Sequence, residues 1–186
     1  MYISKEQLHK MLPNASTKNI DKFLIPINKA LEEFSINTPL RIAAFVAQIG
    51  HESGSLHYVE EIASGSNYEF REDLGNLEFA ALQVAHANYT TTGKFYKGHG
   101  LIQITGYSNH VSCALGLGID CINNPRVLCE PINAARSAAW FWSVHKLNKK
   151  ADIGLFDEIS RTINGGTNGK EERRALYKNC LRVLEC

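Results

Sequence analysis

The sequence lacks long apolar runs and carries almost no net charge. No stretch of 18 consecutive apolar residues is present, so no transmembrane helix and no stable membrane insertion are predicted. The formal net charge is only +1, which gives no basic surface for nucleic acid, and we expect no nucleic-acid partner. The opening segment MYISKEQLHKML lacks the apolar core of a signal peptide. We therefore expect synthesis in the cytoplasm without a signal peptide.

Cysteine is present in an odd number, which argues against a complete disulfide framework. A chain without a secretory signal is expected to keep its thiols free. None of the cysteines lies in a recognisable catalytic-nucleophile context, so thiol catalysis is not favoured. The five positions are Cys113, Cys121, Cys129, Cys180 and Cys186.

A metal site is also not supported, although His51 and Glu52 begin the zinc motif H-E-x-x-H. That motif needs its second histidine four residues after the first, on the same helical face. Here position 55 is serine and the next histidine is His57. We expect neither a metal nor another cofactor.

What the chain does contain is helical periodicity in a composition typical of a globular domain. Hydrophobic residues make up 44% and charged residues 21% of the chain. There is no repeat or linker, so residues 1–186 are expected to form one domain. Pro26 should kink or split the second helix. The aromatic trio of Trp140, Phe141 and Trp142 is expected in the core. Helices are predicted at residues 4–12, 17–35, 38–53, 77–88, 105–116, 131–147, 155–163 and 170–184.

Glu52 is the residue that most suggests catalysis. It continues the apolar stripe of its helix, three residues after Ile49 and seven after Phe45. A desolvated carboxyl group there would have a raised pKa and could donate a proton. The pattern alone is equally consistent with a helix that ends near the surface, because Gly54 follows directly.

Two further segments place polar groups near apolar anchors. If residues 98–106 are extended, Gln103 and Thr105 point to one side and the intervening isoleucines to the other. An outward-facing edge strand would give the same pattern. Asn164 precedes a glycine turn, and Arg174 shares a helical face with apolar residues, so its guanidinium should be partly buried beside a carboxylate.

Taken together, these segments resemble the catalytic domain of glycoside hydrolase family 19, the family of plant-type chitinases and many phage endolysins. The resemblance covers roughly residues 38–180. It rests on ordered motifs, which are AQIGHESG, YEFREDLGN, FYKGHGLIQITGYSNH, SAAWFW and INGGTNG followed by Arg174. It implies a mainly α, two-lobed, lysozyme-like fold with a small β element near the active-site cleft.

The resemblance also implies roles for individual residues. Glu52 matches the general acid, and Glu61 matches the general base of an inverting mechanism, with Glu60 and Glu72 as further base candidates. For Glu61 to face Glu52, the chain must turn after Gly54. Thr105 matches the residue that holds the water. The positions implied in substrate binding or tuning of the acid are Gln103, Asn109, Asn164, Arg174 and Tyr96.

One position departs from the family pattern and one choice stays open. His99 stands where the family usually has arginine, so no charge contact is carried over to it.

The resemblance allows either chitin or the peptidoglycan glycan strand as substrate. We expect a monomeric phage endolysin that a separate holin releases to the wall. A chitinase is the main alternative. A non-catalytic glycan-binding protein and a cell-wall amidase or peptidase are disfavoured, the first by the intact Glu52 and the second by the missing zinc or cysteine signature.

Overall fold

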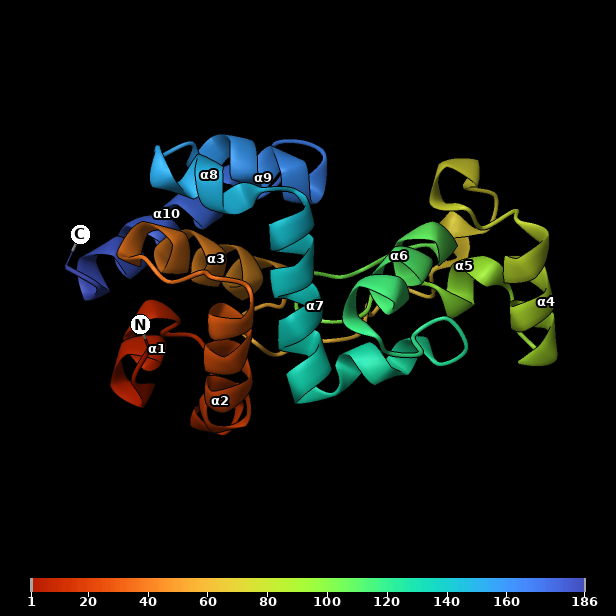
Figure 1. The fold of residues 1–186 in the computed structure, drawn as a ribbon, viewed down its shortest axis with the longest axis horizontal. Helices are drawn as coiled ribbons and strands as arrows, with labels where there is room; N and C mark the ends of the chain where they lie inside the picture. The colour runs from red at the N-terminus through yellow and green to blue at the C-terminus, as the bar shows by residue number, and fades with distance from the viewer. Residues whose placement is uncertain (1, 186) are drawn as a thin grey trace.

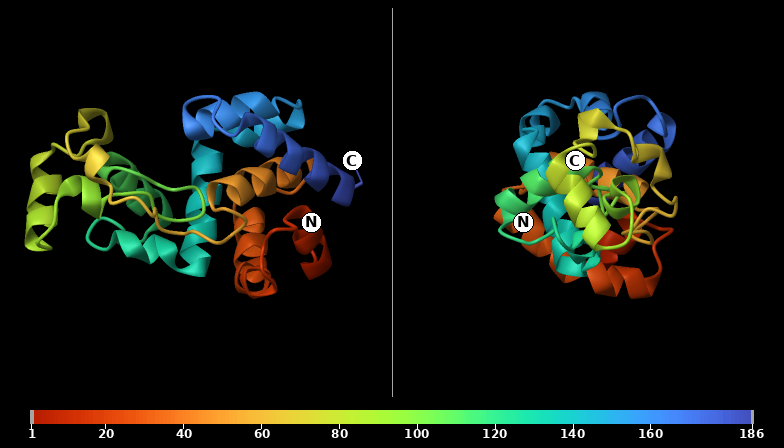
Figure 2. Two further views of the ribbon diagram at one scale, coloured as in Figure 1. Left: turned by 180° about the vertical axis from the view of Figure 1, so that it is seen from behind. Right: turned by 90° about the vertical axis from the view of Figure 1, so that its right-hand side faces the viewer.

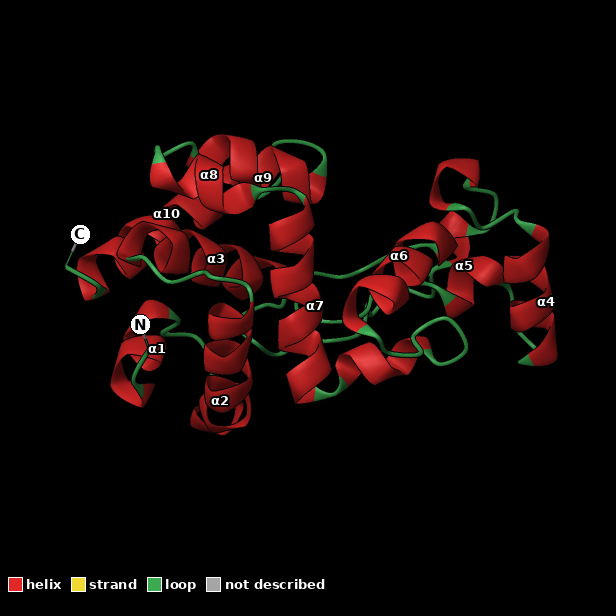
Figure 3. Ribbon diagram, in the orientation of Figure 1, coloured by secondary structure: helices red, strands yellow, loops and turns green. Residues whose placement is uncertain are grey.

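The computed structural model describes residues 2–185 and is built almost entirely from helices (Figure 1, Figure 3). The helices gather into two groups that are joined by the loops after α3 and before α6 and by the turn that leads into α7, as the views from front and back both show (Figure 1, Figure 2). The predicted mainly α, two-lobed fold is therefore confirmed. Cys186 and the thiol expected there lie outside the described residues.

The larger group is organised around α3, Pro39–Glu52, whose interior residues from Ile42 to Gly50 are all buried. Thr38 caps this helix by accepting a hydrogen bond from the Arg41 amide at 3.3 Å, and proline occupies the first helical position. The surrounding helices are α1 (Lys5–Met11), α2 (Thr17–Glu33), α7 (Pro131–Val144), α8 (Leu147–Asp152), α9 (Phe156–Asn164) and α10 (Lys170–Val183).

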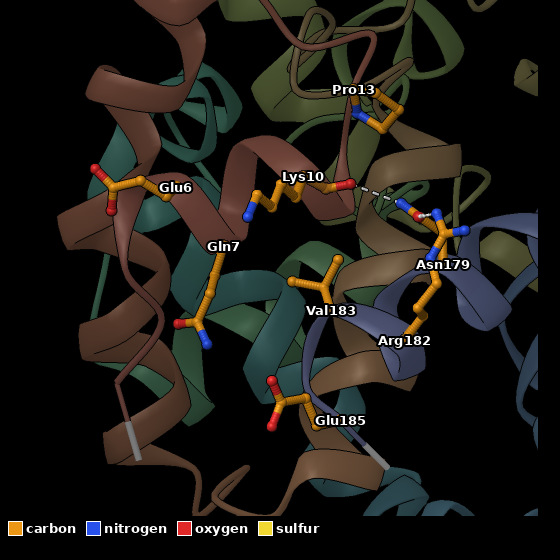
Figure 4. Close-up of a pocket in the computed structure, with 8 residues that line it drawn as sticks. All are labelled: Glu6, Gln7, Lys10, Pro13, Asn179, Arg182, Val183 and Glu185. Carbon is orange, nitrogen blue, oxygen red and sulfur yellow. Dashed lines mark hydrogen bonds between the residues drawn. The ribbon is translucent and has the colours of Figure 1, made fainter.

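The two chain ends meet in this larger group, where α10 packs on both α3 and α1. The Asn179 amide of α10 donates to the carbonyl oxygens of Lys10 and Met11 at 2.7 and 3.0 Å. Helices α1 and α10 flank a pocket of about 670 Å³ that is lined in part by charged side chains, among them Glu6 and Arg182 (Figure 4). The last helix is thus part of the folded core, as its apolar face predicts.

The smaller group holds α4 (Phe79–Ala87), α5 (Thr92–Phe95) and α6 (Tyr107–Leu117), with short 3-10 turns at Ser66–Tyr68 and Glu72–Leu74. A third 3-10 turn, Pro125–Cys129, leads into α7. Within residues 2–185 the β structure consists of two isolated antiparallel bridges, from Glu60 to His99 and from His99 to Ile104. The expected small β element is present in this minimal form.

All eight predicted helices are found, with bounds within three residues of those predicted. Two short helices were missed: α5, and α8, of which only Leu147 lies within the predicted helix 131–147. The chain breaks between α7 and α8 because Lys146 adopts a left-handed conformation, with φ 55°. Pro26 does not split α2, which runs unbroken to Glu33.

Of the aromatic trio, Trp140 and Trp142 lie in the core, as expected, and Phe141 is partly buried and packs against it. Trp142 is fully buried and meets the ring of Phe45 edge to face, with centroids 5.5 Å apart. Trp140 packs its indole against Gly116, where a β-carbon would lie 2.1 Å from Nε1. A larger residue at position 116 would therefore displace Trp140, and α6 and α7 could not approach as they do.

Candidate active site

Glu52 lies at the C-terminal end of α3 and forms an ion pair with Arg173 of α10. The guanidinium Nη2 donates to Glu52 Oε1, and the other carboxyl oxygen has no partner among the described residues. The Glu52 side chain is 17% exposed, whereas that of Arg173 is only 3% exposed. The carboxyl group is thus fixed from behind, with one oxygen left for a substrate.

Arg173 itself is held by a buried network that joins three helices. Its Nη1 donates to Gln48 Oε1 at 2.5 Å, and the Gln48 amide donates to Ser160 Oγ at 2.7 Å. Its Nε reaches the backbone carbonyl of Asn168 at 3.4 Å. Because buried charges are costly unless they are paired and hydrogen-bonded, this network is what allows an arginine to sit beneath Glu52.

His51 directly precedes Glu52 at the end of α3, and its ring interacts electrostatically with Glu52 and Arg173. Burial and the nearby Arg173 charge lower the pKa of the His51 imidazole. His51 also packs against Gly169, where a β-carbon would lie 2.3 Å from the ring. The imidazole is therefore neutral at pH 7 and adds no second positive charge beside Glu52. Among residues 2–185 no three histidine, cysteine or acidic side chains cluster as metal ligands.

The chain turns directly after Glu52. Gly54, Ser55 and Leu56 all have positive φ, at 55°, 59° and 65°. The buried Ser53 hydroxyl braces this turn, since it donates to the Ile49 carbonyl and accepts from the Leu56 amide at 2.9 Å. The predicted turn after Gly54 is confirmed.

Glu61 lies where the chain leaves this turn, and three groups hold it. Its Oε1 accepts from the Tyr68 hydroxyl and its Oε2 from the Gly98 amide, both at 3.0 Å. The Glu61 amide donates to the Gly98 carbonyl at 2.8 Å, and Lys97 Nζ donates to the Glu61 carbonyl at 3.0 Å. Burial and the contact with Glu61 raise the pKa of Tyr68, so its hydroxyl remains a donor. Both carboxyl oxygens of Glu61 are thus held in place by hydrogen-bond donors.

Gln103, Thr105 and Asn109 follow one another in a chain of hydrogen bonds beside Glu61. The Thr105 hydroxyl donates to the Gln103 carbonyl at 2.9 Å, and the Asn109 amide donates to the Thr105 carbonyl at 2.7 Å. A β-carbon on Gly98 would lie 2.5 Å from Gln103 Oε1, so this side chain packs against the residue that binds Glu61. The structure thus places Gln103 next to the residue that binds the candidate base, and it links Thr105 and Asn109 to Gln103.

The expectation of an extended strand through residues 98–106 is wrong in part. Residues 100–103 form a turn between the bridging residues His99 and Ile104, and Gln103 has φ 59°. The glycines at 98 and 100 permit this tight loop, because Gly100 has φ 84° and approaches Ser137 closely. The burial pattern still holds, since Ile102 and Ile104 are buried and Gln103 and Thr105 are partly exposed.

The other two base candidates have different surroundings. Glu60 pairs with Lys97 at 2.9 Å and with Arg126 at 3.0 Å. These hydrogen bonds outweigh the desolvation of the Glu60 carboxyl group and lower its pKa. Glu72 is exposed in a 3-10 turn of the smaller group. Of the three carboxylates, only Glu61 is hydrogen-bonded to the segment that carries Gln103 and Thr105.

Arg174 does not approach Glu52. It forms a two-point pair with Asp157, at 2.9 and 2.6 Å, and a third bond to Glu171 at 3.2 Å, with its side chain 41% exposed. The Arg174 guanidinium holds the pKa of Asp157 below its usual range. The expected carboxylate partner exists, but the buried arginine beside the acid is its neighbour Arg173.

Asn164 and Tyr96 differ in their accessibility to a substrate. The Asn164 side chain is half-buried and orders the glycine turn, since it accepts from the Gly166 amide and donates to the Asn168 carbonyl. Tyr96 is fully buried, and its hydroxyl donates to the Ile122 carbonyl at 3.0 Å. In this structure Tyr96 therefore supports the smaller group from within and cannot touch a glycan, which corrects its expected binding role.

The residues that sequence reasoning missed are those that hold the two carboxyl groups. They are Gln48, Tyr68, Lys97, Gly98 and Arg173. A signal for Arg173 did exist, because Leu176, Cys180 and Leu184 follow it at helical spacing and form a stripe as apolar as the one assigned to Arg174. The roles of the other four residues depend on tertiary contacts, which no local sequence pattern predicts.

Comparisons with known proteins identify the family of this chain. A family model described as chitinase class I matches residues 33–157. A glycosyl hydrolase family 19 domain-containing protein of Haemophilus influenzae is 27% identical over 199 residues, covering 96% of this chain and 95% of that protein. The Arabidopsis thaliana endochitinase At2g43620 is 36% identical over 145 residues, covering 77% of this chain but only 46% of that protein.

Solved structures share the fold. Chitinase C from Streptomyces griseus HUT6037 superposes with a TM-score of 0.75 at 24% identity, covering 98% of this chain and 76% of that one. A bacterial family 19 chitinase superposes with a TM-score of 0.72 at 25% identity, covering 98% of this chain and 94% of that one. This chain thus spans less than half the length of the Arabidopsis relative. It spans nearly all of the Haemophilus influenzae protein and of the bacterial family 19 chitinase.

Proposed function

Since the chain belongs to glycoside hydrolase family 19, the class I chitinase family, we propose that it is an endolysin that cleaves the β-1,4-linked glycan strand of peptidoglycan. It is a glycoside hydrolase with chitinase homologues. The proposal adds the substrate, the residue roles and the biological setting. The observation that supports it best is the pair of anchored carboxyl groups, Glu52 on Arg173 and Glu61 on Tyr68 and Gly98.

In the proposed mechanism Glu52 is the general acid. Its free oxygen, Oε2, protonates the glycosidic oxygen as the bond to the anomeric carbon breaks. Arg173 is a positioning residue, because it touches Glu52 and no reacting atom. The leaving sugar takes the proton, and the anomeric carbon develops the positive charge of an oxocarbenium-like transition state.

Glu61 is the proposed general base on the other side of the sugar. It removes a proton from a water molecule that attacks the anomeric carbon and inverts its configuration. Inverting enzymes hold their carboxyl groups about 6.5–9.5 Å apart to admit that water. Thr105 is proposed to hold the water, and Gln103 and Asn109 to bind the glycan. No residue outside this set is needed to balance the protons.

A chitinase is the second candidate, because several of the most similar relatives are named chitinases or endochitinases. The two substrates share the β-1,4 linkage, and peptidoglycan alone carries peptide stems. The proposed setting is a monomeric protein made in a bacterial host and released to the wall through a separate holin. Within the described residues no helix has the length and apolar character to cross a membrane.

Mass spectrometry of purified peptidoglycan after digestion tests the proposal. New reducing ends on the glycan are expected, whereas new free amines would show an amidase or peptidase. The digest should proceed equally in excess EDTA and after iodoacetamide, because neither a metal nor a thiol takes part. Cleavage of chitin oligosaccharides with no release from peptidoglycan would assign the chain to the chitinases instead.

A further inference from the structure

A second pocket lies on the smaller group, behind the segment that carries Glu61. Its volume is about 640 Å³. Glu60, Lys97 and His99 line its inner side, and Lys94 and Arg126 line its rim. Glu60 directly precedes Glu61 in a β-bridge with His99, and adjacent residues of an extended segment point to opposite faces. The pocket is therefore one residue away from the candidate base but on the other side of the chain.

The charge of this pocket is positive. Three of its lining side chains are basic and only Glu60 is acidic. Glu60 is already shared between Lys97 and Arg126, at 2.9 and 3.0 Å. The exposed Lys94 makes no ion pair with any described residue, and Arg126 is 74% exposed. A negatively charged group could thus bind Lys94 and Arg126 without displacing Glu60 from Lys97.

His99 contributes a buried polar atom that lacks a hydrogen-bond partner. The histidine is 2% exposed, and its Nδ1 is buried without a hydrogen-bond partner. A neutral imidazole carries one N–H donor and one acceptor nitrogen, so the buried Nδ1 of His99 needs a polar partner in either tautomer. A peptide amide can supply that partner in both cases, through its N–H or its C=O, whereas a simple inorganic anion can only accept a hydrogen bond.

We propose that this pocket binds the acidic peptide stem of the substrate, with a stem carboxylate on Lys94 and Arg126 and a stem amide facing His99. The inference rests on the proposed function, because it assigns the same enzyme a substrate that carries peptides. A peptide of five residues spans up to about 17 Å when extended, which is long enough to pass from a glycan at Glu61 around this segment. Chitin has no carboxylate and gains nothing from the pocket.

Binding is tested first with a small probe, N-acetyl-alanyl-glutamate, by amide ¹H–¹⁵N shifts of the whole protein. Shifts are expected at Lys94, His99 and Arg126, and they should weaken at high salt. The double variant Lys94→Gln/Arg126→Gln should bind the probe about tenfold more weakly. The matched control, Lys18→Gln/Lys29→Gln, removes two exposed charges from α2 and should bind normally.

Kinetics then test the link to the substrate. The Lys94→Gln/Arg126→Gln variant should show a KM for peptidoglycan raised about fivefold with kcat unchanged, and unchanged hydrolysis of chitin oligosaccharides. The control variant should match the parent on both substrates. An equal KM on peptidoglycan for parent and variant would overturn the proposal.

Two further outcomes separate the proposals. If sodium sulfate shifts the same amides at the same concentrations as the probe, the pocket is a general anion site and the peptide assignment fails. If peptidoglycan is cleaved but the probe shifts none of these residues, the pocket proposal fails and the proposed function stands. If the probe binds but only chitin is cleaved, the proposed endolysin function is wrong. The peptide stem is then not the natural ligand either, although the pocket does bind peptides.

Discussion

Arg173 and Glu52 form an ion pair that ties the last helix of the chain to the end of the helix that carries the candidate acid. Their side chains are 121 residues apart in sequence. Arg174, the next residue, instead pairs with Asp157 at the surface. The two adjacent arginines therefore give a matched pair of variants, one at the candidate site and one beside it.

Arg173→Gln is expected to destabilise the protein and to lower activity, whereas Arg174→Gln should be mild. Removing one partner of a buried ion pair costs about 3–5 kcal/mol, and the partial exposure of Glu52 favours the lower end. An exposed pair is worth about 0–1 kcal/mol. Urea unfolding and wall-lysis rates measure both effects. If Arg174→Gln were the more damaging variant in both assays, the assignment of Arg173 would be wrong.

Glu52→Gln should fold as the parent does and lose glycan cleavage. The amide oxygen still accepts the hydrogen bond from Arg173, so the network remains, but the amide cannot protonate the leaving oxygen. General acid catalysis contributes about 10²- to 10⁴-fold, and the loss should fall in that range or above it. Reducing-end assays on purified walls measure the loss. More than a tenth of the parent activity in a folded variant would reject Glu52 as the acid.

The three base candidates should rank in one order. Glu61→Gln should remove nearly all activity, because the amide cannot take a proton from water. Glu60→Gln and Glu72→Gln should be milder, since Glu60 is occupied by Lys97 and Arg126 and Glu72 is exposed in a 3-10 turn. The rates are compared at saturating substrate. If another of the three variants were the most damaging, the base would move to that residue and the reaction class would stay.

Some of the site was predictable from the sequence because it depends on local rules. Glu52 follows from the stripe of α3, and the turn between Glu52 and Glu61 follows from Gly54. The register of the last helix was not predictable, since Arg173 and Arg174 each lie on an apolar stripe. Only the packing of α10 on α3 decides between them.

The supports of Glu61 could not be predicted for a different reason. Gly98 donates through its backbone amide, so its side-chain identity says nothing about the bond. Tyr68 reaches Glu61 from a short 3-10 turn between loops, whose position is set by contacts such as the bond from the Asn76 amide to the Tyr68 carbonyl at 2.7 Å. Helical periodicity predicts elements, and it does not predict where loops bring their side chains.

The stability of the protein should fall in mild acid because of two buried histidines. Burial lowers the pKa of His99 to about 4 and that of His110 to about 3. Both values lie below the unfolded value of about 6.5, so the unfolded chain binds more protons between these limits. Stability is therefore fully present above pH 6.5 and is lost as the pH falls. Between pH 6.5 and 5 the loss is about 2 kcal/mol per histidine.

Urea unfolding at pH 7 and pH 5 measures this loss, and His110→Gln provides the comparison. His110 is fully buried, and its Nδ1 lies 2.8 Å from the Gly106 carbonyl. A glutamine at this position does not titrate, so the difference in unfolding free energy between the two pH values should shrink by about 2 kcal/mol, the contribution of one histidine. An identical pH dependence in the parent and the variant would show that His110 is not the source.

Removal of residues 170–186 should abolish folding as well as activity. This segment carries five basic and three acidic side chains, so it is only mildly positive. Strongly basic amphipathic helices bind anionic membranes, but the structure uses the inner face of α10 to pack on α3 and supplies Arg173 to the buried network. Circular dichroism should show an unfolded truncated chain, and a synthetic peptide of the segment should bind anionic vesicles weakly. A truncated protein that stays folded, digests purified walls normally and loses only its action on intact Gram-negative cells would show instead that α10 serves at the membrane.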